Sequence, residues 1–202
     1  MKICIWWDSI SRWAFDYDQW WRVNRLHKRW LKNDNYIYNF SVSSNDTRWV
    51  LYAMEKQIDI IENIEPEDEY IYIFAIWSND ARYINNKENK VVPISEFRSN
   101  LNQIINLSKN ITNKIIFLGI NQIDENKTKP IPREPTEYYE NDDLKEYNKC
   151  IEEICKSNNI DLISMRNLLT PSNFEDGLHP DPKNHKIIYD AVKEYIIDNK
   201  II

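Results

Sequence analysis

Short apolar runs alternate along this chain with longer amphipathic stretches, and this alternation constrains the fold more than any other feature. The runs at 70–77 and 115–120 are almost continuously hydrophobic, as strands buried on both faces of a parallel sheet would be. The stretches between the runs repeat apolar residues at helical spacing, so the sequence predicts an α/β fold. The predicted strands cover 3–7, 36–40, 70–77, 115–120 and 160–164, and the predicted helices cover 17–32, 46–63, 94–111, 141–158 and 182–198.

The bulk composition is typical of a folded, acidic protein. The chain has 202 residues, of which 42% are hydrophobic and 13% aromatic, so we expect a single domain over residues 1–202. A formal net charge of −6 disfavours a nucleic-acid partner, because nucleic-acid-binding proteins usually present a basic face. The chain shows no membrane-length apolar run and no signal-peptide pattern, so we expect no membrane partner and a cytoplasmic location. The sequence leaves the oligomeric state open.

Polar residues with catalytic chemistry follow the predicted strands. Ser9 follows the first strand, residues 43–46 follow the second and 78–80 follow the third, while Asp176 and His179 lie between the fifth strand and the last helix. Because the carboxyl ends of parallel strands meet at one edge of a sheet, we expect these loops to converge. A serine, a histidine and an aspartate are the parts of an acyl-transfer triad. The aspartate orients the imidazole, the imidazole takes the serine proton, and the serine attacks a carbonyl group.

Each of these residues also has an ordinary interpretation when it is taken alone. Ser9 fits a turn after a strand, and Asn79 fits a helix cap or a turn. His179 could form a metal site with Asp181 and His185, but no second cluster of ligands accompanies them. We therefore expect no metal ion.

One long irregular segment, residues 124–139, contains three prolines. It follows the carboxyl end of the fourth predicted strand, where open α/β sheets place their ligands. The segment therefore fits either the rim of a pocket or a plain surface loop.

Four short motifs, in order along the chain, give it a resemblance to a known superfamily. They are Trp7-Asp8-Ser9, Asn39 followed by Ser43-Ser44-Asn45-Asp46-Thr47, Trp77-Ser78-Asn79-Asp80, and Asp176-Gly177-Leu178-His179-Pro180. The corresponding family motifs are Gly-Asp-Ser, Asn followed by Ser-Gly-Asp-Thr, Gly-x-Asn-Asp and Asp-x-x-His-Pro. With this order and spacing, the chain resembles the SGNH hydrolases, the GDSL-type esterase and lipase superfamily.

The resemblance implies a three-layer α/β/α sandwich with a flavodoxin-like, five-stranded parallel sheet. It also implies a serine esterase in which Ser9 is the nucleophile, His179 the general base, and Asp176 the residue that orients His179. The oxyanion hole would consist of the backbone N–H groups of Ser9 and Ser44 and the side chain of Asn79. The expected substrate is a small carboxylic ester, with short acyl groups such as acetyl favoured over triglycerides, and no cofactor is expected.

The chain departs from the family pattern at positions where the family has glycine. Trp7, Ser44 and Trp77 stand at such positions, and Trp13 and Trp20 fall in a stretch where some bacterial relatives have glycine. The whole chain has only 2 Gly but 8 Trp. Either the substitutions are real and narrow the site, or a gene that reads UGA as glycine has been translated with tryptophan. Ordinary UGG codons at these four tryptophans would exclude recoding. Recoding would in any event not explain the serine at position 44.

Two other functions stay open at this point. A catalytically impaired protein of the same fold would bind a carbohydrate or acyl ligand in an aromatic pocket. Trp7, Ser44 and Trp77 favour that function, whereas the intact triad residues favour the esterase. An unrelated flavodoxin-like binding domain or phospho-acceptor would instead depend on Asp8 and Mg²⁺, and it would tolerate the loss of Ser9.

Overall fold

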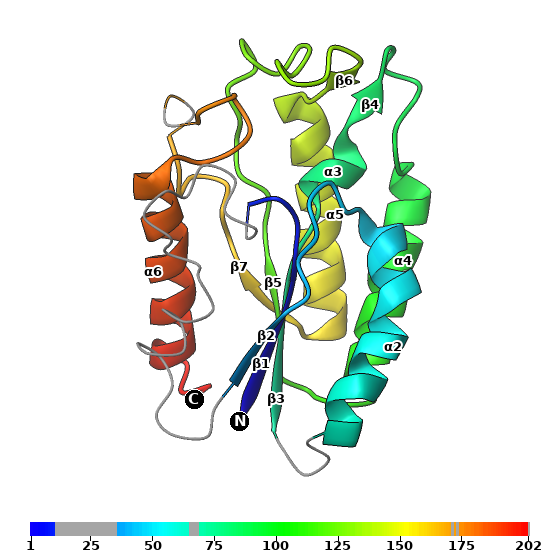
Figure 1. Ribbon diagram of the computed structural model, residues 1–202, viewed down its shortest axis with the longest axis vertical. Helices are drawn as coiled ribbons and strands as arrows, with labels where there is room; N and C mark the ends of the chain where they lie inside the picture. The colour runs from blue at the N-terminus through cyan, green and yellow to red at the C-terminus, as the bar shows by residue number, and fades with distance from the viewer. Residues whose placement is uncertain (11–35, 65–68, 171, 173, 202) are drawn as a thin grey trace.

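A computed structural model describes residues 1–10, 36–64, 69–170, 172 and 174–201 of the chain (Figure 1). The helix predicted at 17–32 lies outside the described residues, as do Trp13 and Trp20.

A parallel sheet forms the centre of the molecule. Its strands are β1 (Lys2–Trp7), β2 (Tyr36–Asn39), β3 (Tyr70–Ala75), β5 (Ile115–Leu118) and β7 (Asp161–Ile163). The strand order is β2-β1-β3-β5-β7, and every pairing is parallel. β1, β3 and β5 are buried along their whole length. That burial on both faces explains why their sequences are almost continuously hydrophobic.

Helices cover both faces of this sheet (Figure 1). They are α2 (Thr47–Ile64), α4 (Ile94–Lys109) and α5 (Asn141–Asn158) on one face, and α6 (Pro182–Asp198) on the other. Alternate side chains of β1 belong to different cores: Cys4 and Trp6 pack with the three helices, whereas Ile3 and Ile5 pack with α6. The predicted three-layer α/β/α sandwich with a five-stranded parallel sheet is therefore confirmed. Among the helices in the described ranges, none has the length and apolar character needed to cross a membrane.

Three short elements were not predicted from the sequence. α3 (Ser78–Ala81) turns the chain after β3, and β4 (Tyr83–Ile84) pairs antiparallel with β6 (Glu137–Tyr138). β4 and β6 have two residues each and α3 is about one helical turn, so none of them carries a periodic pattern that the sequence could show. β6 falls near the end of the segment that was predicted to be irregular.

Candidate active site

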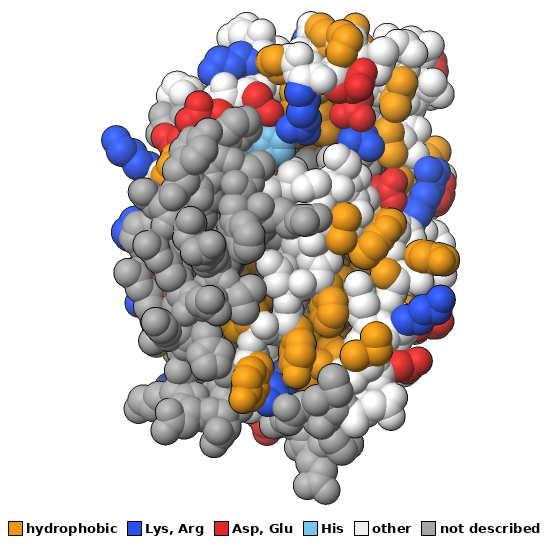
Figure 2. Space-filling model, viewed as in Figure 1, with side chains coloured by type: hydrophobic (Ala, Val, Ile, Leu, Met, Phe, Trp, Pro, Cys, Tyr) orange, Lys and Arg blue, Asp and Glu red, His pale blue; other side chains and the backbone are white. Residues whose placement is uncertain are grey.

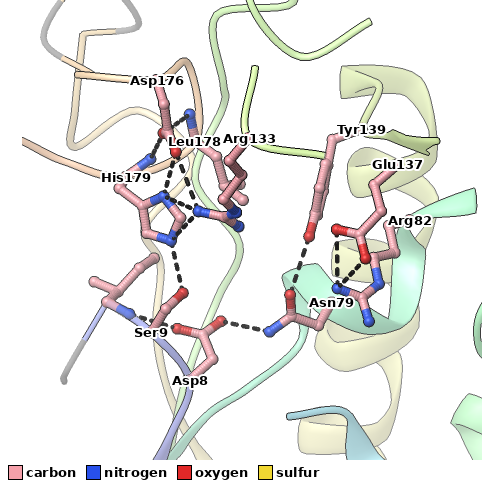
Figure 3. Close-up of polar contacts among 11 residues, drawn as sticks. Asp8, Ser9, Asn79, Arg82, Arg133, Glu137, Tyr139, Asp176, Leu178 and His179 are labelled. Carbon is pink, nitrogen blue, oxygen red and sulfur yellow. Dashed lines mark hydrogen bonds and ion pairs between the residues drawn. The ribbon is translucent and has the colours of Figure 1, made fainter. Parts of the chain in front are cut away.

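Parallel pairing brings the loops after β1, β3 and β7 to the same edge of the sheet. On the surface near this edge, acidic and basic side chains gather around a histidine (Figure 2). Ser9 follows β1, Asn79 lies in α3 after β3, and Asp176 and His179 lie between β7 and α6 (Figure 3). Ser9 and His179, which are 170 positions apart in the sequence, are thereby within hydrogen-bonding distance.

Ser9, His179 and Asp176 form a continuous chain of hydrogen bonds. Ser9 Oγ lies 2.7 Å from His179 Nε2, and His179 Nδ1 lies 2.8 Å from Asp176 Oδ2. Burial would raise the pKa of the Asp176 carboxyl, but its interactions with His179 outweigh burial and lower that pKa to about 2. The ionised carboxylate can only accept, so Nδ1 carries the proton and Nε2 is left to accept the Ser9 hydroxyl. A general base needs this tautomer.

The loop that carries Asp176 and His179 is held in place by its own backbone. Asp176 Oδ1 accepts the backbone N–H groups of Leu178 (3.1 Å) and His179 (2.9 Å). Gly177 has a φ of 89°, and a Cβ at this position would lie 2.7–2.8 Å from three atoms of the facing loop. Only glycine fits there. The Gly177 carbonyl also accepts the N–H of Asp124 in the facing loop, at 2.9 Å.

Asp8 and Asn79 form a second polar group beside Ser9 (Figure 3). Asp8 is 2% exposed, and burial raises the pKa of its carboxyl to about 6, although the Ile10 N–H bond and the charge of His179 oppose the rise. Its Oδ1 accepts the Ile10 N–H at 2.9 Å, and its Oδ2 lies 3.4 Å from Asn79 Nδ2. The Asn79 amide therefore has its donor side toward the Asp8–Ser9 turn.

The second and third motifs are tied together by buried hydrogen bonds. Asn79 Nδ2 donates to the Asn45 carbonyl at 2.9 Å. The backbone N–H and the hydroxyl of Thr47 both donate to Asp80, at 3.1 and 2.5 Å. Asp80 thus satisfies a donor at the start of α2, where backbone N–H groups have no partner within the helix. These bonds hold the turn containing Ser44 next to Asn79.

The three positions at which the family has glycine differ in what their backbone requires. Ser44 has a φ of 62°, in the left-handed region where glycine is favoured. Trp77 has a φ of −80° and Trp7 ends β1, so neither backbone needs glycine. Both indoles are buried, and they help to line a cavity of about 20 Å³ beside the residues that flank Ser9 and His179. A cavity of that size holds one water molecule or a methyl group, not a sugar ring.

Two residues of the 124–139 segment reach this site, and neither was predicted from the sequence. Arg133 Nη1 lies 3.1 Å from Asp176 Oδ2, and the Tyr139 hydroxyl donates to Asn79 Oδ1 at 3.1 Å. Burial raises the pKa of Tyr139 to about 12, so this hydroxyl keeps its proton. The segment therefore borders the candidate site, which favours the rim of a pocket over a plain surface loop. Its position after the fourth strand was the only signal for either residue.

The geometry does not favour the metal or phospho-acceptor alternatives. Among the described residues, no group of three or more His, Cys, Asp or Glu side chains is arranged to hold a metal ion. Asp181 caps α6 instead, by accepting the N–H of Asn184 at 2.8 Å. Asp8 is almost fully buried, which shields it from a phosphoryl donor.

The fold and the residues at its carboxyl edge define an SGNH-type ester hydrolase. The chain belongs to the GDSL-like lipase/acylhydrolase family, whose model matches residues 6–187. The family predicted from the four motifs is therefore confirmed. A search among curated proteins found no match to this sequence.

Several solved structures share this fold over nearly the whole chain. A lipase/acylhydrolase from Enterococcus faecalis is 20% identical with a TM-score of 0.73, and the match covers 98% of this chain and 96% of that one. An acetylxylan esterase from Geobacillus stearothermophilus is 17% identical with a TM-score of 0.69, covering 96% and 93%. The acetyl xylan esterase AlAXEase is 12% identical with a TM-score of 0.71, covering 97% and 100%. At these identities the similarity is one of fold.

Proposed function

We propose that this protein hydrolyses small carboxylic esters with short acyl groups, acetyl above all, through an acyl-enzyme on Ser9. Ester hydrolysis follows from the family, and the acyl-enzyme on Ser9 is the further step. The observation that carries it is the unbroken chain from Ser9 through His179 to Asp176, with bonds of 2.7 and 2.8 Å. Such a chain activates a serine hydroxyl for attack on a carbonyl group.

The proposed reaction has two halves. Ser9 Oγ attacks the ester carbonyl carbon while its proton passes to His179 Nε2, and Asp176 stabilises the imidazolium that forms. As the tetrahedral intermediate collapses, the bond to the alcohol oxygen breaks and His179 gives its proton to that oxygen. Water then attacks the acyl-enzyme, His179 accepts its proton, and that proton returns to Ser9 as the carboxylic acid leaves.

The oxyanion would be stabilised by the N–H groups of Ser9 and Ser44 and by Asn79 Nδ2. Asn79 supports this role because the orientation of its amide is set from both sides. Tyr139 donates to its oxygen at 3.1 Å, and one of its Nδ2 hydrogens is used by the Asn45 carbonyl at 2.9 Å. The other hydrogen is directed toward Asp8 over a long 3.4 Å, so it is available to a developing negative charge.

Two observations support a short acyl group. Among the described residues, the cavity that Trp7 and Trp77 help to line lies next to Ile10 and Leu178 and has a volume of about 20 Å³, which suits a small group such as a methyl. Two of the structures that share the fold are acetylxylan esterases by name. The predicted cytoplasmic location and the expected absence of a nucleic-acid partner stay predictions.

The proposal is tested by hydrolysis of 4-nitrophenyl acetate together with labelling by a fluorophosphonate probe and peptide mass spectrometry. Ser9→Ala and His179→Ala should each lower kcat by up to ~10⁶-fold, and the double variant should lose little more. Ser99→Ala, which changes an exposed serine of α4, is the matched control and should keep the parent rate.

Parent-like hydrolysis by Ser9→Ala would refute the proposed nucleophile. A folded parent that neither hydrolyses the ester nor takes the label, but whose tryptophan fluorescence is quenched saturably by an oligosaccharide, would favour the catalytically impaired binding protein.

A further inference from the structure

The guanidinium of Arg133 lies against the proposed acid–base pair. Its Nη1 is 3.1 Å from Asp176 Oδ2, 3.0 Å from His179 Nδ1 and 3.4 Å from His179 Nε2. Nδ1 already donates its hydrogen to Asp176, so it has no lone pair to offer Arg133. The contact with the imidazole is therefore a close approach of a positive charge to the ring, and Figure 3 shows the side chain reaching toward it from the 124–139 loop.

This approach matters because His179 becomes positive when it accepts the Ser9 proton. Two like charges at contact distance repel each other, by an amount that depends on how much water separates them. The Arg133 side chain is 42% exposed, so water screens part of the repulsion. Asp176 offsets another part, because it contacts both cations. A neutral ester brings no negative charge that would offset the rest of this repulsion.

The outer part of the guanidinium is open to a ligand. Among the described residues, Nε and Nη2 of Arg133 make no hydrogen bond, since all the polar contacts of its guanidinium run through Nη1. The neighbouring Glu134 does not pair with it and instead accepts the Thr136 hydroxyl at 2.7 Å. Nε and Nη2 form a planar fork that matches the two oxygens of a carboxylate.

The position of Arg133 also indicates which half of the ester it would contact. His179 Nε2 protonates the leaving alcohol, and Arg133 Nη1 is 3.4 Å from that nitrogen. The carbonyl oxygen, by contrast, is expected at Asn79, on the other side of Ser9. A group held by Arg133 therefore belongs to the alcohol half.

We propose that Arg133 selects esters whose alcohol half carries an anion, a carboxylate in particular, close to the ester oxygen. The anion binds Nε and Nη2 and offsets the charge of the guanidinium. The imidazole of His179 can then become positively charged when it accepts the Ser9 proton. A neutral ester leaves the guanidinium unopposed and reacts slowly. This inference rests on the proposed function and adds a substrate class to it.

The test compares two acetyl esters of nearly equal size, 3-acetoxybenzoate, which is an anion at neutral pH, and 3-acetoxybenzamide, which is neutral. In Arg133→Gln, kcat/KM should fall roughly 10- to 100-fold for the benzoate, because a charge-assisted contact is lost. It should rise, by up to about tenfold, for the benzamide, because the repulsion is lost. Arg133→Lys should keep the benzamide slow and retain only part of the activity toward the benzoate, since it has the charge without the fork.

Arg98→Gln is the matched control. Arg98 is 47% exposed and pairs with Glu153 of α5, so its loss should leave both rates unchanged. Changes of the same sign and size for both esters in Arg133→Gln, or no change in either, would overturn the selection by Arg133. The esterase proposal would survive that result if 3-acetoxybenzamide hydrolysis still required Ser9. A parent enzyme no faster than Ser9→Ala on both esters would overturn both proposals.

Discussion

Replacing Asp8 with asparagine should change how the stability of the protein depends on pH. Asp8 is 2% exposed and lies next to the proposed nucleophile. Burial is the largest cause that acts on its carboxyl, and it raises the pKa from 3.8 to about 6 against the opposing Ile10 N–H bond and the His179 charge. In the unfolded chain, the same carboxyl is exposed and titrates at its ordinary value.

The direction of the pH dependence follows from the number of protons that Asp8 binds in the folded and the unfolded chain. Between pH 3.8 and 6, folded Asp8 holds a proton that the unfolded chain has lost, so the free energy of unfolding falls as the pH rises through this window. At 1.36 kcal/mol per pKa unit, the shift corresponds to about 3 kcal/mol of lost stability. Nearly the whole of this loss is present at pH 7, and about a fifth of it at pH 4. The Asp8→Asn variant has no such titration.

Urea unfolding of the parent and of Asp8→Asn between pH 4 and 7 measures the effect. The free energy of unfolding of the variant minus that of the parent should rise by about 2.4 kcal/mol over this range. Any offset at pH 4 reports the hydrogen bonds to Ile10 and Asn79, and it cancels from the change. Asp59→Asn, at an exposed position of α2, should show no comparable rise. A constant difference for Asp8→Asn would refute the reasoning.

Three further changes test the local geometry. Ser44→Gly should stabilise the protein by about 1 kcal/mol in urea unfolding, because it relieves a side chain held at a φ of 62°. Gly177→Ala should destabilise it by more than about 1 kcal/mol and remove fluorophosphonate labelling, because the new Cβ would displace the loop that carries Asp176 and His179. Tyr139→Phe should lower kcat about tenfold at unchanged KM, and have little further effect in an Asn79→Ala background, because its hydroxyl reaches the candidate site through that amide. Tyr147→Phe, which also loses a buried hydrogen bond, should leave kcat unchanged.

How much of the fold could be predicted depended on the length and burial of each element. α6 begins and ends at the predicted residues, 182 and 198, because its apolar stripe is long and regular. β3 and β5 were predictable because strands buried on both faces are hydrophobic throughout. The two-residue strands β4 and β6 form only because distant segments pack together, and such contacts leave no local pattern.

How much of the candidate site could be predicted also depended on whether the contacts of each residue are local. Asp176 and His179 could be predicted because their arrangement is local. The Asp176 side chain accepts the backbone N–H groups of the residues that follow it, so the short Asp-x-x-His motif contains the residues that form the loop. Arg133 and Tyr139 could not, because their contacts depend on how the 124–139 loop packs across the sheet edge. The left-handed backbone of Ser44 could not be predicted either, since a sequence does not show which of several replaced glycines has a positive φ.

The hydrogen bond between the Asp124 N–H and the Gly177 carbonyl joins the 124–139 loop to the loop that carries Asp176 and His179. Neither loop can open without breaking that bond, so the amide hydrogens of both should exchange with solvent as one cooperative unit. A ligand that binds Arg133 would then slow amide exchange around His179 as well, so binding at one loop would stabilise both loops.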